Sequence, residues 1–239
     1  MSDPAAATRE LPIPPAPWWL TGEGYIFPLK STREHVLRHG FLPPSEQDCF
    51  VGGWGAWMLV RYRDSPVGPY DELLYIPGYS RRGWRLTWQI TKIYVSTEAS
   101  ARAGIRTWGL PKEVAPFAFT TEGDALRAVV GEPSDPFFAA TLRVHGPTFP
   151  IVSLGTPPSL RQPVRAWPPT NTSLPPVREG AWLQLPALGL GWGWSRLVAL
   201  GDVVIDPTRF PDVHASGTLR TGLACLPFRM NFPVPRQIG

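Results

Sequence analysis

Three lysines are conspicuous in a chain that otherwise places arginine at its basic positions. Only Lys30, Lys92 and Lys112 are lysines among 23 basic residues, and the other 20 are arginines. A guanidinium keeps its proton and forms no imine, whereas a lysine amine can lose a proton and condense with a carbonyl carbon. Each retained lysine is therefore a candidate for Schiff-base chemistry, with an exposed surface charge as the alternative.

The first two lysines have structural explanations that require no catalytic role. Lys30 immediately precedes a predicted helix, where an exposed charge is expected. Lys92 lies on the apolar face of an alternating segment, and there a long side chain can extend along a sheet edge and place its charge in water. Neither environment indicates a nucleophile.

Lys112 lies in a more restrictive context, the stretch TWGLPKEVAP. Pro111 restricts the backbone just before it, and Trp108 and Leu110 provide apolar neighbours. The alternative is a loop lysine that forms a salt bridge with Glu113, the next residue. Position alone leaves both interpretations open.

The elements that must position Lys112 are short strands between turns. The chain of 239 residues contains 30 Pro and 23 Gly without a period, together with 11 Trp and 11 Phe. This composition is typical of a β-rich domain, and we expect a mainly β (α+β) domain of antiparallel strands. The predicted strands are 24–29, 54–63, 70–76, 83–95, a hairpin over 117–131 that turns at 122–124, and runs around 137–146, 181–188, 195–205 and 218–232.

Two short helices are expected to accompany these strands. A capping-box pattern at Ser31 precedes a predicted helix over 32–39. A second helix is expected to begin after Ser96 or Thr97 and to end near Gly109. The second helix would therefore lead directly into the lysine motif.

A carboxylate occupies the apolar face of the predicted strand 70–76. Tyr70, Glu72, Leu74 and Ile76 share one face of that strand. A carboxylate on such a face needs a partner or must take up a proton. Glu72 therefore belongs to a functional site, or it lies at the solvent-exposed end of the strand and pairs with an arginine.

Charge and cysteine content exclude several classes of function. The net charge is +4 and the pI about 9.3, but no basic run exceeds Arg81-Arg82, so we expect no nucleic-acid partner. The N-terminal sequence lacks a signal-peptide pattern, and Pro and polar residues interrupt the apolar stretch 181–200. We therefore expect no membrane association and a cytoplasmic location. Cys49 and Cys225 are expected to be free thiols.

Metal and cofactor sites are not indicated. His35 and His39 are four residues apart on the first predicted helix and share a face, but without further ligands they are interpreted as a surface pair. The Gly-rich segments lack the strand–GxGxxG–helix context of a nucleotide site. We expect no metal, no cofactor, a poorly ordered lead over 1–17 and a single domain over 18–239.

Several motifs, taken in order, resemble the acetoacetate decarboxylase superfamily. WGLPKEVA, which begins at Trp108, is similar to that family's Trp-Gly-Phe-Pro-Lys-Lys motif. GPYDEL, which begins at Gly68, is similar to its Tyr-x-Glu strand about 40 residues before the lysine. EASARAG and GYIFPLKSTREHVLRHGFLPP are similar to the intervening helix and to the N-terminal strand and helix. The resemblance covers about 18–119.

The resemblance implies both a fold and a chemistry. The fold would be an antiparallel β cone or barrel around a small apolar pocket, with short peripheral helices. The activity would be that of a lyase in which Lys112 forms an imine with a small keto acid or ketone, for decarboxylation or a related aldol or dehydration step. Glu72 would orient the amine or shuttle protons, no cofactor is expected, and a homo-oligomer is expected. The residues implied to bind the substrate are Trp57, Tyr70, Trp108, Leu110 and Arg106.

Three positions depart from the family's pattern. Glu113 replaces the second lysine of the motif, and a carboxylate there would favour the charged form of the amine if the two side chains meet. The ungapped match places Trp57 where the decarboxylase has another pocket glutamate. The family's N-terminal arginine has no counterpart, so Arg61 or Arg106 would have to replace it. Trp57 and Glu113 leave a second function open beside the enzyme, that of a non-catalytic protein that holds a small apolar ligand on the same fold.

Overall fold

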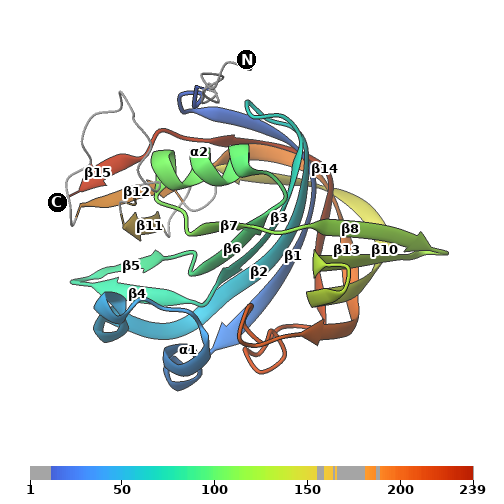
Figure 1. Ribbon diagram of the computed structural model, residues 1–239, viewed down its shortest axis with the longest axis horizontal. Coiled ribbons are helices and arrows are strands. Elements are labelled where there is room, and N and C mark those ends of the chain that lie inside the picture. Colours follow the sequence, from blue (N-terminus) through green and yellow to red (C-terminus); the bar gives the residue numbers. More distant parts are fainter. Residues whose placement is uncertain (1–11, 155–158, 164, 166–180, 187–188, 239) are drawn as a thin grey trace, which may run out of the picture.

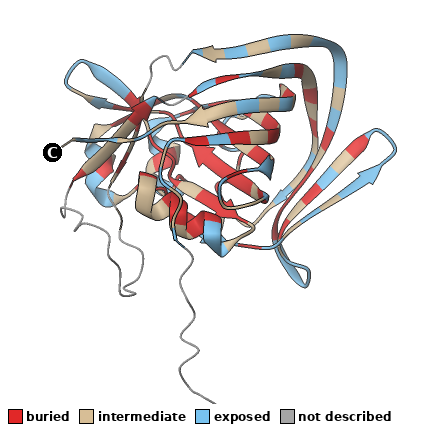
Figure 2. Ribbon diagram, turned by 90° about the horizontal axis from the view of Figure 1, so that it is seen from above, coloured by how far each residue is buried: buried red, intermediate tan, exposed pale blue. Residues whose placement is uncertain are grey.

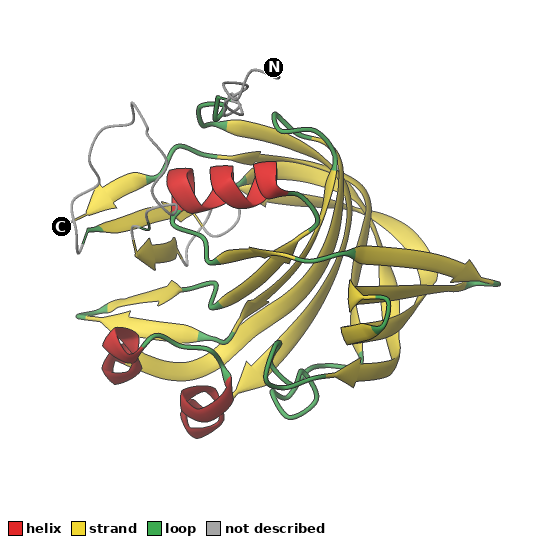
Figure 3. Cartoon of the chain, in the orientation of Figure 1, coloured by secondary structure: helices red, strands yellow, loops and turns green. Residues whose placement is uncertain are grey.

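The computed structural model of the chain describes residues 12–154, 159–163, 165, 181–186 and 189–238, and strands dominate this part (Figure 3). Residues 1–11 of the predicted lead therefore lie outside the described residues. The helices are α1 (Arg33–His39), η1 (Pro44–Cys49, a 3-10 helix) and α2 (Glu98–Trp108). The strands are β1 (Trp18–Ser31), β2 (Phe50–Asp64), β3 (Tyr70–Ile76), β4 (Tyr79–Arg82), β5 (Arg85–Trp88), β6 (Lys92–Val95), β7 (Lys112–Val114), β8 (Phe117–Glu122), β9 (Ala125–Glu132), β10 (Asp135–Leu154), β11 (Ser159–Pro163), β12 (Trp182–Pro186), β13 (Leu190–Ile205), β14 (Thr221–Phe232) and β15 (Arg236–Ile238).

The described strands form one large, curved sheet (Figure 1). Its order is β15-β12-β11-β5-β4-β2-β1-β14-β13-β10-β9-β8, and β3, β6 and β7 branch from β2. The mainly β, largely antiparallel fold is confirmed, but the sheet is not closed into the barrel that we had included in our expectation. The sheet forks at β2, which pairs with β4 over its first residues and with β3 over 56–62. β15 and β8 end the main path of the sheet, and β7 ends the branch that starts at β3.

A β–α–β crossover completes the branch at β3. β6 pairs antiparallel with β3, and β7 pairs parallel with β6, with Ile93 opposite Lys112. A parallel pair cannot be joined by a tight turn, so a longer connection is needed. α2 provides it and lies beside β6 and β7 (Figure 1). The crossover therefore places a helix directly over the start of β7.

Side-chain caps begin both α-helices, as the sequence predicts. The Thr32 and Thr97 hydroxyls each accept a hydrogen bond from a backbone N–H of the first turn, both at 3.3 Å. The first cap is Thr32 rather than Ser31, because the Ser31 hydroxyl donates to the Pro77 carbonyl instead. The predicted boundaries of the two helices are confirmed to within a residue or two.

The alternating segment 83–95 is two strands rather than one. β5 pairs with β4 and β11, whereas β6 pairs with β3 and β7. Between them, Thr91 N–H donates to the Tyr75 carbonyl at 3.1 Å, and the Ile90 carbonyl accepts from Gln162 Nε2 at 3.2 Å. The alternation of residue types in the sequence continues through this break, so it does not reveal that the two strands join different branches of the sheet. Ile90 and Tyr94, which the alternation places on one face, lie in different cores.

The sheet buries a separate core on each face, called here the first core and the second core. Strand β2 contributes to both, because successive side chains point to opposite faces. Trp57 and Leu59 lie in the first core, and Val60 and Tyr62 lie in the second, which also contains the buried residues of α2. Figure 2 shows buried residues along the curved strands and also on a helix that packs against them.

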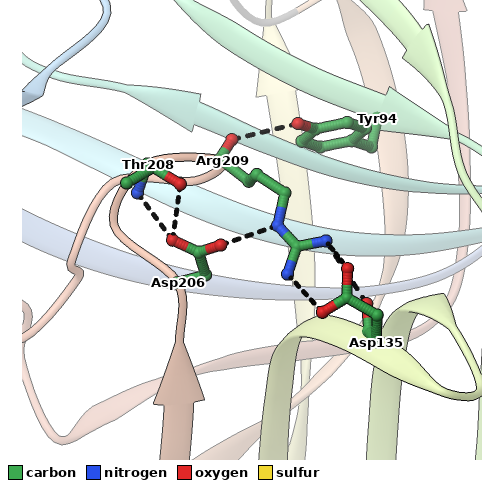
Figure 4. A network of polar contacts seen from close by, with 5 residues as sticks. All are labelled: Tyr94, Asp135, Asp206, Thr208 and Arg209. Carbon is green, nitrogen blue, oxygen red and sulfur yellow. Dashed lines mark hydrogen bonds and ion pairs between the residues drawn. The ribbon is translucent and has the colours of Figure 1, made fainter.

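Arg209 links three segments around the first core (Figure 4). Its guanidinium donates to both carboxylate oxygens of Asp135, at 2.9 and 3.1 Å, and to Asp206 at 2.7 Å. The Arg209 carbonyl accepts from the Tyr94 hydroxyl at 3.0 Å. Hydrogen bonds from Thr208 hold the pKa of Asp206 below its ordinary value. The network joins β6, β10 and the loop before β14.

Two expectations from the sequence have plain structural outcomes. Cys49 and Cys225 are free thiols, as predicted, and burial raises the pKa of Cys225. Among the residues described, none of the helices has the length and apolarity needed to span a membrane.

Gly109→Ala is expected to destabilise the fold more than alanine at another left-handed glycine. Gly109 has φ 67°, and an added Cβ would lie 2.2 Å from the Pro163 carbonyl oxygen. Gly123 has φ 61° with no atom within 4 Å of an added Cβ. Gly123→Ala should cost about 1 kcal/mol of unfolding free energy from the backbone alone, and Gly109→Ala should cost at least about twice as much. Urea denaturation measures both, and equal losses would contradict the predicted clash.

Candidate active site

Lys112 begins β7 and directs its side chain toward α2. Only 4% of that side chain is exposed. A tight turn leads to this position, in which Lys112 N–H donates to the Leu110 carbonyl at 2.8 Å. Gly104 on α2 leaves the space that the lysine occupies, because an added Cβ there would lie 2.6 Å from Lys112 Cδ and 2.7 Å from Cε. The helix therefore needs a glycine at this position for the amine to lie beneath it.

The amine meets Glu72 in the second core. Lys112 Nζ lies 2.9 Å from Glu72 Oε2, and only 6% of the Glu72 side chain is exposed. Glu72 comes from β3, on the same face as Tyr70 and Leu74, as the alternation predicts. Two buried opposite charges compensate for lost hydration only while they remain paired. The contact therefore ties β3 to β7.

Ser100 of α2 supplies a third polar group. Lys112 Nζ donates to Ser100 Oγ at 3.0 Å, and Ser100 has no exposed surface. Ser100 also forms a hydrogen bond with the Tyr70 side chain. Ser100 and Gly104 are four residues apart on the helix and so face the same way. One provides a hydroxyl for the amine, and the other provides room for its stem.

Two tyrosines cover the ion pair. Lys112 Nζ lies 4.9 Å from the centre of the Tyr70 ring, a cation–π contact, and the Tyr62 hydroxyl donates to Glu72 Oε1 at 3.4 Å. The two ring centres are 4.6 Å apart. Burial, and then the negative charge of Glu72, raise the pKa of both phenols well above the ordinary value. Both hydroxyls therefore stay protonated at neutral pH and can donate hydrogen bonds.

A hollow of about 240 Å³ adjoins the two tyrosines. Glu72 and Lys112 do not line it, so the tyrosine rings separate the ion pair from the hollow. Arg61, which could replace the missing arginine of the family, is present here and pairs with Asp71 at 3.4 Å. The lining residues are Arg61, Tyr62, Arg63, Pro69, Tyr70, Asp71 and Ser96.

Glu113 makes its ion pair away from Lys112. Adjacent residues of a strand point to opposite faces, and Glu113 Oε1 lies 2.6 Å from Lys92 Nζ. Lys92 also lies 4.9 Å from the centre of the Tyr94 ring, on the first-core side of the sheet. The salt bridge considered for Lys112 therefore belongs to Lys92, and Glu113 does not accept a hydrogen bond from the Lys112 amine.

Trp57 is not brought to the lysine. It is fully buried in the first core, with its ring stacked on Phe27 at 4.5 Å between centres. Its neighbours Val60 and Tyr62 point to the opposite face of β2, where Lys112 lies. The ungapped match had placed a pocket residue at position 57, but the alternation of β2 puts this side chain on the wrong face to line a pocket around the amine.

The remaining predicted site residues lie around the crossover. Trp108 and Leu110 are buried in the second core, and Trp108 Nε1 donates to the Pro233 carbonyl at 2.9 Å. Trp108 also packs edge-on against Trp18, with ring centres 4.9 Å apart. Arg106 lies half-buried in the last turn of α2. Trp108 and Leu110 thus support the turn into Lys112, in the same core as the ion pair.

Ser100 and Tyr62 are the two polar site residues that the sequence analysis missed, and the sequence contains a signal for each. Ser100 and Gly104 share a face of a predicted helix, directly before the lysine motif. Tyr62 lies opposite Tyr70 in the register of β2 and β3. Pairing the predicted strands 54–63 and 70–76 through their intervening turn already places these two tyrosines together.

The histidine pair shows no sign of a metal site. The His35 and His39 rings are 5.3 Å apart between centres, and His35 Nε2 lies 3.2 Å from Ser216 Oγ. Within the described part of the chain, no three His, Cys, Asp or Glu side chains gather in a group that could hold a metal ion.

Replacing one partner of the buried ion pair is expected to lower the unfolding free energy more than replacing both partners. Lys112→Met or Glu72→Leu alone leaves one charge buried without a partner and should lower the unfolding free energy by about 3–5 kcal/mol. The double variant should lose less than either single variant, as urea denaturation can measure. Glu113→Gln is the control, because it removes a partly exposed pair and should cost less than about 1 kcal/mol. Losses that simply add in the double variant would contradict the coupling.

The raised pKa of Tyr62 predicts a loss of stability at alkaline pH. A tyrosine of the unfolded chain loses its proton near pH 10, whereas the folded Tyr62 keeps it to higher pH. Its contribution is therefore complete below about pH 10 and is lost as the pH rises further. Above this pH, the unfolding free energy of the wild type should fall more steeply than that of Tyr62→Phe. Parallel pH profiles would argue against the burial of this phenol.

Comparison with known sequences shows a local likeness. The chain matches no known protein-family profile. It is similar to Protein NEOXANTHIN-DEFICIENT 1 of Oryza sativa subsp. japonica, with 38% identity over 113 residues, which are 46% of this chain. The match spans 36% of that protein's length.

Comparison with solved structures shows a likeness along almost the whole chain. Acetoacetate decarboxylase of Legionella pneumophila matches with a TM-score of 0.62 and 15% identity, over 98% of this chain and 92% of that one. An acetoacetate decarboxylase-like enzyme of Sphingomonas wittichii RW1 matches with a TM-score of 0.64 and 13% identity, over 98% and 99%. The enduracididine biosynthesis enzyme MppR, complexed with pyruvate, matches with a TM-score of 0.59 and 14% identity, over 99% and 95%. The resemblance seen in the sequence is confirmed at the level of the fold: this chain has the fold of the acetoacetate decarboxylase-like superfamily.

Proposed function

We propose that the chain is an acetoacetate decarboxylase-like enzyme whose Lys112 forms an imine with a small keto acid or ketone. The buried amine carries this proposal. Lys112 Nζ lies 2.9 Å from Glu72 and 3.0 Å from Ser100, while Glu113 is occupied elsewhere. An apolar environment with a carboxylate within proton-transfer distance suits an amine that must become a nucleophile.

Glu72 is positioned to take the proton that the ammonium must lose. The free amine then attacks the carbonyl carbon of the substrate, and loss of water gives an iminium on Lys112. With a β-keto acid, the bond between the α-carbon and the carboxylate breaks, its electron pair moves toward the iminium nitrogen, and carbon dioxide leaves. The resulting enamine takes a proton on carbon, and water hydrolyses the new iminium to release the ketone and the lysine.

The side chains around the pair have roles in this scheme. The Tyr62 hydroxyl donates to Glu72 and holds the carboxylate toward the amine. Tyr62 and Tyr70 also line the hollow that adjoins the cluster, which is the route by which we infer that a small substrate approaches. Arg61 and Arg63 line the same hollow, where they pair with Asp71 and Glu23, so an acidic substrate would compete with these two carboxylates for the guanidinium groups.

The names of two structural relatives support the substrate class. One is acetoacetate decarboxylase, and the other, MppR, was complexed with pyruvate. Acetoacetate and pyruvate are both small keto acids, which present the carbonyl that a lysine amine requires. For this chain, the fold and Lys112 together favour a substrate of that class.

A second candidate function is supported by the enclosure of the amine. Ser100 and Gly104 lie directly against the lysine, and the hollow reaches the tyrosines but not Lys112. A buried ion pair can also serve as a purely structural link. In that case the protein would bind a small apolar molecule without catalysis, and the amine would never meet a carbonyl.

Reductive trapping tests the imine directly. Wild-type protein incubated with pyruvate or acetoacetate and sodium borohydride should gain a covalent adduct on Lys112, located by peptide mass spectrometry. Lys112→Arg should lose the adduct, and Lys92→Arg, the matched control, should retain it. Release of carbon dioxide from β-keto acids then separates decarboxylation from aldol or dehydration steps. Absence of an adduct with every keto acid would favour the ligand-binding alternative.

Gly104→Ala is a second variant for reductive trapping, because it retains Lys112 but displaces its side chain. Its Cβ would lie 2.6 Å from Lys112 Cδ, so the side chain must move. Displacement on this scale should slow trapping about 100-fold. Gly123→Ala, at an open turn, should keep the wild-type rate, which separates displacement of the lysine from a general effect of replacing glycine.

A further inference from the structure

The face of β1, β14, β13 and β10 that is opposite the second core carries a concentration of exposed apolar side chains. Six of the fourteen large apolar residues exposed in the described part of the chain lie on it, although it belongs to only four strands. Such a patch on one surface is typical of a binding site. The six are Trp19, Val152, Leu154, Leu190, Trp192 and Trp194.

Two glycines hold the tryptophans of β13 on this face. Gly191 and Gly193 alternate with Trp192 and Trp194 along the strand. An added Cβ would lie 3.1 Å from a carbonyl oxygen of β14 at Gly191, and 2.5 Å from another at Gly193. A shift by one residue would drive the indoles into β14, so the register that keeps both rings outward is enforced.

The patch contains a groove of about 330 Å³. This volume lies near the lower end of the range of about 300–1,000 Å³ that is typical of small-molecule sites. Arg229 is the one charged residue among the described residues that line it. The apolar walls include Pro150, Val152, Trp192, Trp194 and Phe228.

Arg229 is held in the groove by stacking rather than by an acid. Its guanidinium carbon lies 5.0 Å from the centre of the Trp19 ring and 5.7 Å from that of Trp192. None of the ion pairs formed between described residues includes Arg229. Stacking occupies the flat faces of a guanidinium and leaves the N–H donors on its edge free for a planar anion.

We propose that this groove binds a small aromatic carboxylate. The apolar part of the ligand would pack against Trp192, Trp194 and Val152, and its carboxylate would pair with the edge of Arg229. The groove has one fixed cation, so it matches an apolar molecule with one anionic group. A purely apolar ligand would leave the Arg229 guanidinium unpaired. This site lies on the opposite face of the sheet from Lys112, and it is independent of imine chemistry.

Isothermal titration with naphthalene carboxylate and its neutral carboxamide tests the proposal. The wild type should bind the carboxylate at least about tenfold more tightly than the carboxamide, because a charge-assisted pair is added. Arg229→Gln should abolish this preference while retaining weak binding of both probes. Trp192→Ala should weaken the binding of both. Thermal unfolding of each variant checks that it is folded, and Arg229→Met, which also removes the charge, is the substitute if Arg229→Gln is not.

Arg85→Gln is the matched control. Arg85 stacks on the exposed Trp84 at 4.9 Å but does not line the groove, so its loss should leave both affinities unchanged. Equal affinity for the two probes, or a preference that survives in Arg229→Gln, would overturn the proposal. So would sedimentation showing that Trp192→Ala separates a dimer, since the face would then be covered by a second copy of the chain.

Discussion

The contact between Lys112 and Glu72 is the interaction on which the rest of the arrangement depends. Each charge is almost wholly withdrawn from water, so neither is tolerable without the other. To bring them together, β7 must lie beside β6 and α2 must cover them both, which the β6–α2–β7 crossover achieves. Ser100 and Tyr62 satisfy the remaining polar atoms, one by accepting from the ammonium and the other by donating to the carboxylate.

Strand alternation keeps the two lysine–glutamate pairs of this region apart. Lys112 and Glu113 are adjacent in β7 and therefore point to opposite faces of the sheet. Lys92 reaches Glu113 on one face, and Lys112 reaches Glu72 on the other. A one-residue shift of β7 would exchange the two environments and place Glu113 beside Glu72. The parallel register that sets Ile93 opposite Lys112 thus determines which lysine is buried.

The parts of this site that could be predicted were those governed by local rules. Alternation in a seven-residue strand is enough to bury Glu72, and caps define the helix before Lys112. Trp57 could not be placed, because a match without gaps does not tell on which face of β2 a side chain lies. The break in 83–95 and the open sheet were also missed, since both follow from which strands pair across long separations in sequence, and no periodicity encodes that choice.

Near β14, one residue contacts both the groove and the second core. Phe228 lines the outer groove, yet its ring centre lies 6.0 Å from that of Tyr62, which donates to Glu72. The register of β1 with β14 shifts between Gly22 and Gly24, and a bulge of this kind bends a strand and turns its side chains. Gly24 leaves room there, since an added Cβ would lie 3.4 Å from the Phe228 ring. Phe228 therefore packs its ring in the second core while it borders the groove, and Arg229, the next residue of β14, faces the groove itself.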